Sequence, residues 1–228
     1  NIIVDFAMRY GNPSIKSKLK LLKEKGCEKI IILPLYPQYA AATTATVCDE
    51  VYKTLMTMRW QPSLQIIPHY ESEPLYIKAL VNSIKNKIKN INWKPQMIIA
   101  SYHGIPQSYF DKGDPYQCYC QKTTRLIKDI FSEIEIKTTF QSRFGPQEWL
   151  KPYTDKTIDD LPNQGIKDIL VICPGFASDC VETLEEINIQ ARESFLNNGG
   201  KNFDLIPCLN ENPDHIELFE TLIKRYLI

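Results

Sequence analysis

The chain has 228 residues, 43% of them hydrophobic and 24% charged, which is an ordinary composition for a globular protein. Lysine plus arginine and aspartate plus glutamate both number 27, so the net charge is zero and no overall field attracts nucleic acid. No run reaches the roughly 18 uninterrupted apolar residues of a membrane span, and no signal peptide is visible.

The first 92 residues alternate short apolar runs with amphipathic segments. This alternation predicts strands that alternate with helices, and therefore a parallel sheet covered on both faces. We expect strands at Asn1–Phe6, Lys29–Leu33 and Leu64–Ile67, with helices that begin at Ser14, after Ala45 and at Pro74. Because the chain opens inside an apolar run, we expect the first domain to be incomplete at its N-terminus.

The second half repeats the rhythm after a boundary at Asn90–Pro95. Strands are predicted at Met97–Ser101, Ile136–Phe140, Asp168–Ile172 and Asp204–Pro207, with a last helix from Pro213 that has Ile216, Phe219, Leu222 and Ile223 inward. We expect two Rossmann-like, doubly wound α/β domains at 1–92 and 93–212, followed by a C-terminal helix at 213–228. No GxGxxG fingerprint or Walker motif is present, so a nucleotide is not the obvious ligand.

Two carboxylates follow the buried strand predicted at Asp168–Ile172. Glu182 and Glu186 are four residues apart and Gln190 follows at the same spacing, so a helix places all three on one face. They leave the carboxyl end of a parallel strand, where open α/β sheets bind ligands. Asp179 and Glu182 also resemble a capping box, in which Glu182 would only secure the first helical turn. Spacing alone leaves both interpretations open.

The three histidines differ in their surroundings along the sequence. His103 lies between Tyr102 and Gly104 at the end of a strand, where a sharp turn can project it into a cleft, although a lone histidine there is more often structural. His69 also ends a strand, but no acidic helix begins beside it, so we expect a structural role. His215 falls in the first turn of a helix, where we expect an exposed and neutral side chain.

The seven cysteines are odd in number and mostly scattered, which favours a reducing compartment such as the cytoplasm. Cys118 and Cys120 form a CxC pair, but such a pair supplies two of the usual four metal ligands and no second close pair exists. We therefore expect free thiols.

Aromatic and basic side chains collect where the predicted strands end. This combination suits a large, flat and partly apolar ligand with acidic edges, because aromatic faces pack on the ligand plane and a guanidinium meets a carboxylate bidentately. The residues are Arg9, Tyr10, Tyr36 and Tyr39 in the first half, and His103, Arg143, Trp149, Phe176 and Glu182 in the second.

Five segments together resemble the ferrochelatase family of the proteobacterial type. They are LPLYPQYAAATTAT (Leu33–Thr46), SYHGIP (Ser101–Pro106), KGDPY (Lys112–Tyr116), FQSRFGPQEWLKPYTD (Phe140–Asp155) and CPGFASDCVETLEEI (Cys173–Ile187). The resemblance runs over essentially the whole chain. It implies a chelatase fold and an enzyme that inserts Fe²⁺ into protoporphyrin IX to give protohaem, the last step of haem biosynthesis. It also implies that roughly the first quarter of the usual protein is absent.

The resemblance also implies roles for individual side chains. His103 and Glu182 would face the porphyrin centre and handle metal and protons, and Glu186 would belong to the iron route, so these three are the expected metal residues. The expected substrate-binding residues are Arg9, Tyr10, Tyr36, Trp149 and Phe176.

Three departures from the family pattern affect these expectations. Cys180 stands where many relatives have histidine, and Gln190 stands where a third carboxylate often continues the acidic ridge. Ala41 stands where the human-type enzyme has its first cluster cysteine, and the chain stops at Ile228 before the other three. We therefore expect no [2Fe-2S] cluster and no required cofactor.

The expected partners are protoporphyrin IX and Fe²⁺, with no nucleic acid. The lysine-rich segment Lys78–Lys89 is more often a solvated face than a membrane surface, so we expect a cytoplasmic protein with at most a weak peripheral contact with the inner membrane. Two alternatives stay open. The chain could be a chelatase for another tetrapyrrole, such as coproporphyrin III or a cobalt-accepting precursor, or a non-catalytic porphyrin-binding fragment. The sequence indicates no oligomeric state.

Overall fold

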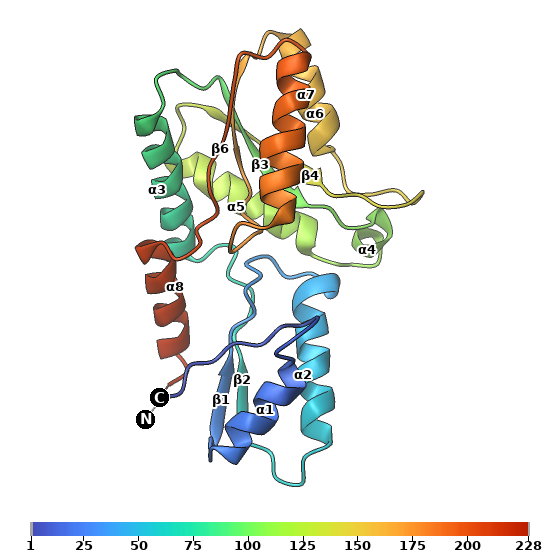
Figure 1. The fold of residues 1–228 in the computed structure, drawn as a ribbon, viewed down its shortest axis with the longest axis vertical. Helices are drawn as coiled ribbons and strands as arrows, with labels where there is room; N and C mark the ends of the chain where they lie inside the picture. Colours follow the sequence, from blue (N-terminus) through green and yellow to red (C-terminus); the bar gives the residue numbers. More distant parts are fainter. Residues whose placement is uncertain (1, 228) are drawn as a thin grey trace.

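The structure is a computed structural model that describes residues 2–227. Two parallel sheets organise it, one of two strands and one of four. In Figure 1 the small sheet lies with α1 and α2 in the lower part of the molecule, and the large sheet lies in the upper part with α5, α6 and α7. The predicted α/β class with parallel sheets is confirmed.

In the small sheet, β1 (Lys29–Ile32) pairs with β2 (Ser63–Ile66) in parallel. The helix α1 (Ile15–Glu24) begins where expected, because the Oγ of Ser14 accepts a hydrogen bond from the backbone N–H of Ser17 at 3.1 Å. A short π-helical segment, Ala41–Ala45, leads into α2 (Thr46–Met56). The apolar faces of both helices cover the sheet with a core of Ile15, Leu19, Ile30, Val47, Val51 and Leu55.

The strand predicted at Asn1–Phe6 is wrong for residues 2–6, and Asn1 lies outside the described residues. These residues form no strand and are exposed; Val4 is 88% exposed. Asp5 instead accepts a hydrogen bond from Lys18 of α1 at 2.7 Å. An apolar run becomes a strand only when a neighbour supplies ladder hydrogen bonds, and within residues 2–227 no strand pairs with this segment.

The large sheet has the order β4-β3-β5-β6, and all its strands are parallel. The strands are β3 (Met97–His103), β4 (Glu135–Gln141), β5 (Asp168–Ile172) and β6 (Asn202–Leu205). From β3 the chain first adds β4 on one side and then crosses to add β5 on the other. The carboxyl ends of β3 and β5 therefore flank a topological switch point, where doubly wound sheets bind their ligands.

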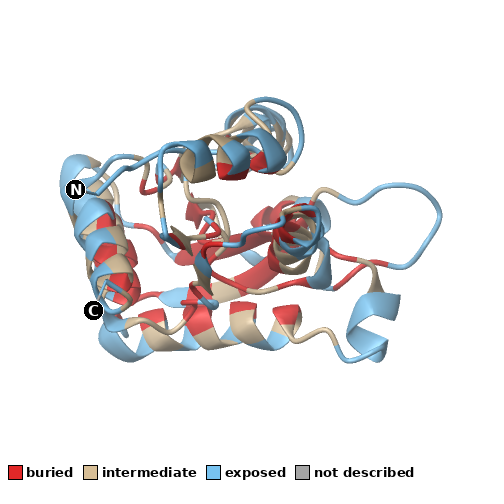
Figure 2. Ribbon diagram, turned by 90° about the horizontal axis from the view of Figure 1, so that it is seen from below, coloured by how far each residue is buried: buried red, intermediate tan, exposed pale blue. Residues whose placement is uncertain are grey.

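Helices cover both faces of the large sheet. Alternate residues of β3 point to opposite faces: Ile98 and Ala100 pack in the core under α3 (Pro74–Asn90), α5 (Tyr116–Ile130) and α8 (Pro213–Lys224). Met97 and Ile99 pack in the second core, under α6 (Thr154–Asp160), the 3₁₀ turn Pro162–Gln164, the helix Glu182–Ala191 and α7 (Arg192–Asn197). Figure 2 shows that the buried residues line the inner sides of these helices. The short α4 (Gln107–Asp111) carries no buried residue.

The helices α3 and α8 pack against each other, and α3 shares a core with the large sheet. The domain boundaries 1–92, 93–212 and 213–228 remain a prediction. The helix α8 begins at Pro213 as expected, with Asn212 as its cap. Of the residues predicted to face inward, Leu222 is buried and Phe219 and Ile223 pack against the core, whereas Ile216 is exposed. Leu218, which was not predicted, is also buried.

His215 is also buried, so its predicted exposure is wrong. Its Nδ1 lies 2.8 Å from the carbonyl oxygen of Asn210, and its ring packs on Phe219 with centroids 4.1 Å apart. Burial lowers the pKa of His215, so the predicted neutral state agrees with its surroundings.

The helix Glu182–Ala191, which we call the acidic helix, has the hydrogen-bond pattern of a π-helix. In this helix each hydrogen bond joins residues five positions apart instead of four. π-Helices are rare in proteins, and those that occur are often found at functional sites. Within residues 2–227, no helix combines the length and the apolar character that crossing a bilayer requires.

Candidate active site

His103 is the last residue of β3 and is half-buried. Its Nδ1 lies 2.6 Å from the carbonyl oxygen of Gly104. A carbonyl oxygen can only accept a hydrogen bond, so Nδ1 carries the proton and Nε2 of the neutral ring keeps its lone pair. The rings of Phe144 and Phe176 lie with their centroids 6.4 Å from the imidazole. The arrangement therefore offers a nitrogen base in an aromatic setting.

The turn after His103 depends on a glycine. A Cβ atom on Gly104 would lie 2.9 Å from the carbonyl oxygen of Gln141 and 3.2 Å from the ring of Trp149. The backbone N–H of Gly104 donates to that same oxygen at 2.7 Å, and the hydroxyl of Tyr116 donates to the carbonyl oxygen of His103 at 2.9 Å. These contacts join the ends of β3 and β4 and fix the backbone that carries the imidazole.

Glu182 is the first residue of the acidic helix, which follows β5 across the switch point. The pKa of Glu182 lies below its usual value because its own backbone N–H and the thiol of Cys180 donate to the carboxylate, and because His103 is close enough to contribute positive charge when protonated. Glu182 is therefore a carboxylate at neutral pH. The structure therefore places His103 and Glu182 within electrostatic reach of each other, near the ends of neighbouring strands.

The capping-box interpretation of Asp179 and Glu182 is wrong. The backbone N–H of Asp179, which such a box would pair with Glu182, donates to Asn210 Oδ1 at 2.9 Å. The carboxylate of Asp179 accepts hydrogen bonds from the backbone N–H of Cys208 at 3.1 Å and from the hydroxyl of Thr183 at 3.3 Å. The carboxylate of Glu182 thus does not pair with the backbone N–H of Asp179.

Glu186 lies one turn further along the acidic helix and is bound to the chain that leaves β4. Its Oε1 accepts the backbone N–H of Ser142 at 2.8 Å, and its Oε2 accepts the Ser142 hydroxyl at 2.5 Å. Both carboxylates, Gln190 and the side chains of Asp155 and Asp159 line one cavity of about 500 Å³. His103 does not line it. Gln190 is exposed and donates a hydrogen bond to Glu185.

An aromatic wall stands beside His103. Trp149 is buried, and its Nε1 donates to the carbonyl oxygen of Phe144 at 3.0 Å. The rings of Phe144 and Trp149 pack edge to face with centroids 5.7 Å apart, while Phe176 contributes from the turn after β5. Phe144 is 65% exposed. Three rings from two strand exits are therefore in place to contact an apolar ligand near the imidazole.

Arg9, Tyr10 and Tyr36 form a separate group near the end of β1. The Arg9 guanidinium lies 4.5 Å from the centroid of the Tyr10 ring. Burial and the neighbouring Tyr10 raise the pKa of Tyr36, and the charge of Arg9 opposes them. The Nε of Arg9 is buried without a hydrogen-bond partner among the described residues. The sequence placed these three, together with Tyr39, where the strands of the first half end, and the structure brings the three close to one another.

Comparison with known proteins decides the family. A family model for ferrochelatase matches residues 1–227. The chain belongs to the ferrochelatase family. It is 55% identical to the ferrochelatase of Agrobacterium fabrum, over all of this chain and 67% of that protein. It is 53% identical to the ferrochelatase of Rhizobium meliloti, over 99% of this chain and 67% of that protein. The chain thus spans about two thirds of the length of these ferrochelatases.

Solved chelatase structures share the fold. SirB from Bacillus subtilis with Fe³⁺ matches with a TM-score of 0.72 at 12% identity, over 97% of this chain and 81% of that chain. The sirohydrochlorin chelatase SirB from Bacillus subtilis subspecies spizizenii in complex with cobalt matches with a TM-score of 0.66 at 11% identity, over 94% of this chain and 76% of that chain. At such identities the likeness concerns the fold alone, and it agrees with the predicted chelatase-like architecture.

Membership of the ferrochelatase family confirms the predicted function. The chain is a metal-inserting enzyme of haem biosynthesis, with Fe²⁺ as a substrate and protoporphyrin IX as the porphyrin that the family name implies. Within residues 2–227, no three His, Cys, Asp or Glu side chains are grouped closely enough to hold a metal ion.

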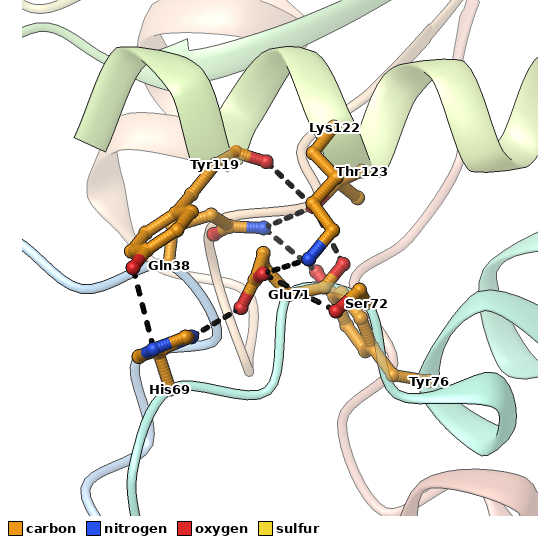
Figure 3. Close-up of polar contacts among 8 residues, drawn as sticks. All are labelled: Gln38, His69, Glu71, Ser72, Tyr76, Tyr119, Lys122 and Thr123. Atoms are coloured by element: carbon orange, nitrogen blue, oxygen red, sulfur yellow. Dashed lines mark hydrogen bonds and ion pairs between the residues drawn. The ribbon is translucent and has the colours of Figure 1, made fainter. Parts of the chain in front are cut away.

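Sequence reasoning missed a buried polar network at the junction of the two sheets (Figure 3). Glu71, between β2 and α3, is 1% exposed. Its carboxylate accepts hydrogen bonds from His69 Nδ1 at 2.5 Å and from Lys122 Nζ of α5 at 2.9 Å. The His69 ring stacks on Tyr119 with centroids 4.4 Å apart. These contacts give His69 the structural role that the sequence predicted.

The network continues from Glu71 to the turn that carries Phe176. The hydroxyl of Thr123 donates to the carbonyl oxygen of Glu71 at 2.9 Å, and it accepts a hydrogen bond from Gln38 Nε2 at 3.0 Å. The same amide points toward the hydroxyl of Tyr76 (Figure 3). This hydroxyl donates to the carbonyl oxygen of Pro174. Burial holds the pKa of Tyr76 well above its usual value, so this hydroxyl keeps its proton. A glutamine inside the apolar run Leu33–Tyr39 was the available signal in the sequence.

We expect Glu71→Gln to lower the free energy of unfolding by about 1–3 kcal/mol at neutral pH, because His69 and Lys122 lose a charged acceptor. Burial raises the pKa of Glu71, but the hydrogen bonds from Lys122 and His69 outweigh it and lower the pKa overall. The carboxylate therefore stabilises the fold fully above its unfolded pKa of about 4.3, and this contribution is lost as the pH falls through the lower folded pKa.

Urea unfolding of both proteins at several pH values measures this effect. The difference between them should shrink on acidification, and the exposed Glu217→Gln should change little at any pH. A Glu71→Gln protein as stable as the parent at neutral pH would show that the network does not stabilise the junction.

Proposed function

We propose that His103 and Glu182 form the catalytic pair of this ferrochelatase. One observation supports the role of the histidine most directly: its Nδ1–H is used by the carbonyl oxygen of Gly104, so its Nε2 is a base whose orientation is fixed. When Fe²⁺ enters a porphyrin, two pyrrole N–H protons leave, so the two charges of the metal ion replace the charges of two protons. Nε2 of a neutral imidazole can accept such a proton at physiological pH.

Glu182 would act on the metal and on the outgoing protons. Its lowered pKa keeps it ionised, and a carboxylate oxygen is a suitable ligand for a hydrated divalent cation. Because Glu182 lies beside His103, the imidazole could remove a pyrrole proton while the carboxylate of Glu182 holds the cation nearby. Glu186, which lines the cavity of about 500 Å³ with Glu182, would then supply metal or carry protons away.

The porphyrin would lie between the two groups of aromatic residues. Trp149 and Phe176 would contact the ring face beside His103, because aromatic faces pack well on a flat macrocycle. Arg9, Tyr10 and Tyr36 would contact an acidic edge, where a guanidinium can pair with a carboxylate. The buried Nε of Arg9, which has no partner among the described residues, supports a role in binding such a group.

The remaining features of the enzyme follow from the same proposal. We propose that it uses no [2Fe-2S] cluster and no required cofactor, because Ala41 occupies the position of a cluster cysteine in the human-type enzyme. We place it in the cytoplasm, with at most a weak peripheral contact with the inner membrane. The sequence pattern of free cysteines supports this location.

The alternatives are separated by one comparison of substrates. Initial rates are measured for Fe²⁺ insertion into protoporphyrin IX and coproporphyrin III, and for Co²⁺ insertion into a corrinoid precursor. We expect the highest kcat/KM with protoporphyrin IX. A clear preference for one of the other two would reassign the substrate, and tight porphyrin binding without turnover would identify a binding module.

A further inference from the structure

Ser142 has an unusual backbone conformation. Its φ is +60°, in the left-handed region that residues other than glycine and asparagine rarely adopt. Among residues 2–227 only Asn210 shares this feature outside glycine. At Ser142 the conformation aims both the backbone N–H and the hydroxyl at the carboxylate of Glu186, at 2.8 and 2.5 Å. A serine at this position thus supplies two donors to Glu186, whereas a glycine would supply only the backbone N–H.

Gln141, the preceding residue, is the last residue of β4 and is 4% exposed. Its Nε2 donates to the carbonyl oxygen of Glu182 at 2.8 Å and lies 3.4 Å from Oε2 of Glu186. A carbonyl oxygen can only accept, so this contact fixes which end of the amide faces the acidic helix. The other end, Oε1, accepts the hydroxyl of Ser101 at 2.7 Å.

Gln141 is held in place by a chain of buried hydroxyl groups. The Ser101 hydroxyl also lies 2.8 Å from the hydroxyl of Thr154, which in turn donates to the hydroxyl of Thr139 at 2.8 Å. All three of these residues are at most 1% exposed. A satisfied buried network of this kind fixes a unique geometry. The exit of β4 is therefore a rigid base from which two successive residues hold the first turn of the acidic helix.

We propose that Ser142 is a positioning residue for iron delivery: it fixes the carboxylate of Glu186 beside the cavity, with Gln141 holding the backbone at Glu182. The proposal rests on the proposed function of Glu182 and Glu186. Without the hydroxyl, Glu186 keeps the backbone N–H and can turn about its side-chain bonds, so fewer of its orientations suit a cation that moves toward Glu182. In this role Ser142 acts through Glu186, the carboxylate that it binds.

Three substitutions separate the hydroxyl from the backbone conformation. Ser142→Gly keeps the N–H donor and accepts a positive φ, so only the hydroxyl is lost. We expect it to raise the Fe²⁺ concentration for half-maximal rate by about three- to tenfold and to leave kcat within about twofold. Ser142→Ala should have the same iron dependence but a lower Tm than Ser142→Gly, because alanine is strained at this φ. Ser142→Asn tolerates the conformation and restores an N–H donor, so it should recover most of the iron affinity.

The control is Ser72→Ala. The Ser72 hydroxyl also donates to a carboxylate, that of Glu71 at 3.2 Å, outside the cavity, and its loss should leave the iron dependence unchanged. The proposal is overturned if Ser142→Gly keeps the parent's iron dependence, or if it lowers kcat alone. The proposed function of Glu186 fails separately, through a Glu186→Gln enzyme with the parent's iron dependence, so the two failures are distinguishable.

Discussion

Replacement of His103 by alanine is expected to lower the rate of Fe²⁺ insertion by at least about 10²-fold, the lower part of the range for loss of a general base. The structure gives the reason. The Nδ1–H of His103 is bound to the carbonyl oxygen of Gly104, so Nε2 is the nitrogen that can take a pyrrole proton. The rings of Trp149, Phe144 and Phe176 remain in the variant, and porphyrin affinity should therefore change little.

Steady-state rates and porphyrin binding, measured by fluorescence quenching on the same preparations, test this expectation. His69→Ala is the matched control, because His69 also follows a strand but binds Glu71 and Tyr119 instead of facing the aromatic wall. Its rate should stay near that of the parent. A His103→Ala enzyme within a few-fold of the parent would remove His103 from the mechanism.

Glu182→Gln is expected to lower kcat severely, whereas Glu186→Gln should chiefly raise the Fe²⁺ concentration for half-maximal rate. The two residues have different surroundings: Glu182 lies beside Cys180 and His103, and the carboxylate of Glu186 is held by Ser142. Loss of an interaction made only in the transition state lowers kcat, whereas loss of an interaction that binds the metal beforehand raises the metal concentration for half-maximal rate.

Gln190 extends this comparison along the cavity. Gln190→Glu should leave kcat unchanged and raise the rate modestly at low Fe²⁺, because it adds a carboxylate to the same lining. Glutamine and glutamate have nearly equal helix propensities, so these exchanges test charge and not folding. Rates over a range of Fe²⁺ concentrations check all three. If Glu182→Gln keeps nearly the parent's kcat, and all three variants keep the parent's iron dependence, then Glu182, Glu186 and Gln190 have only a structural role.

The alternation of strands and helices could be predicted because it depends on local patterns. Apolar runs such as Asp168–Ile172 are buried on both faces of a parallel sheet, and this leaves a clear signal in the sequence. The ends of β3 and β5 then had to meet at one edge, so His103 and Glu182 could be placed together before any coordinates. The resemblance to the ferrochelatase family assigned their roles.

The features that were missed depend on contacts between distant residues. The π-helical form of Glu182–Ala191 has no signature in its own residues, and it receives a hydrogen bond from Gln141, 41 positions earlier. The burial of Glu71 depends on Lys122 from another helix. The run at Asn1–Phe6 has strand-like residues but no paired neighbour among the described residues. Local patterns contain none of this information.

The double variant His103→Ala, Glu182→Gln tests the central claim most directly. If both side chains act as a unit on the same insertion step, kcat/KM for Fe²⁺ insertion in the double variant should be close to that of the more damaged single variant, because groups that act together are strongly non-additive. Fold losses that multiply would contradict the claim, since they would show that the two side chains act independently.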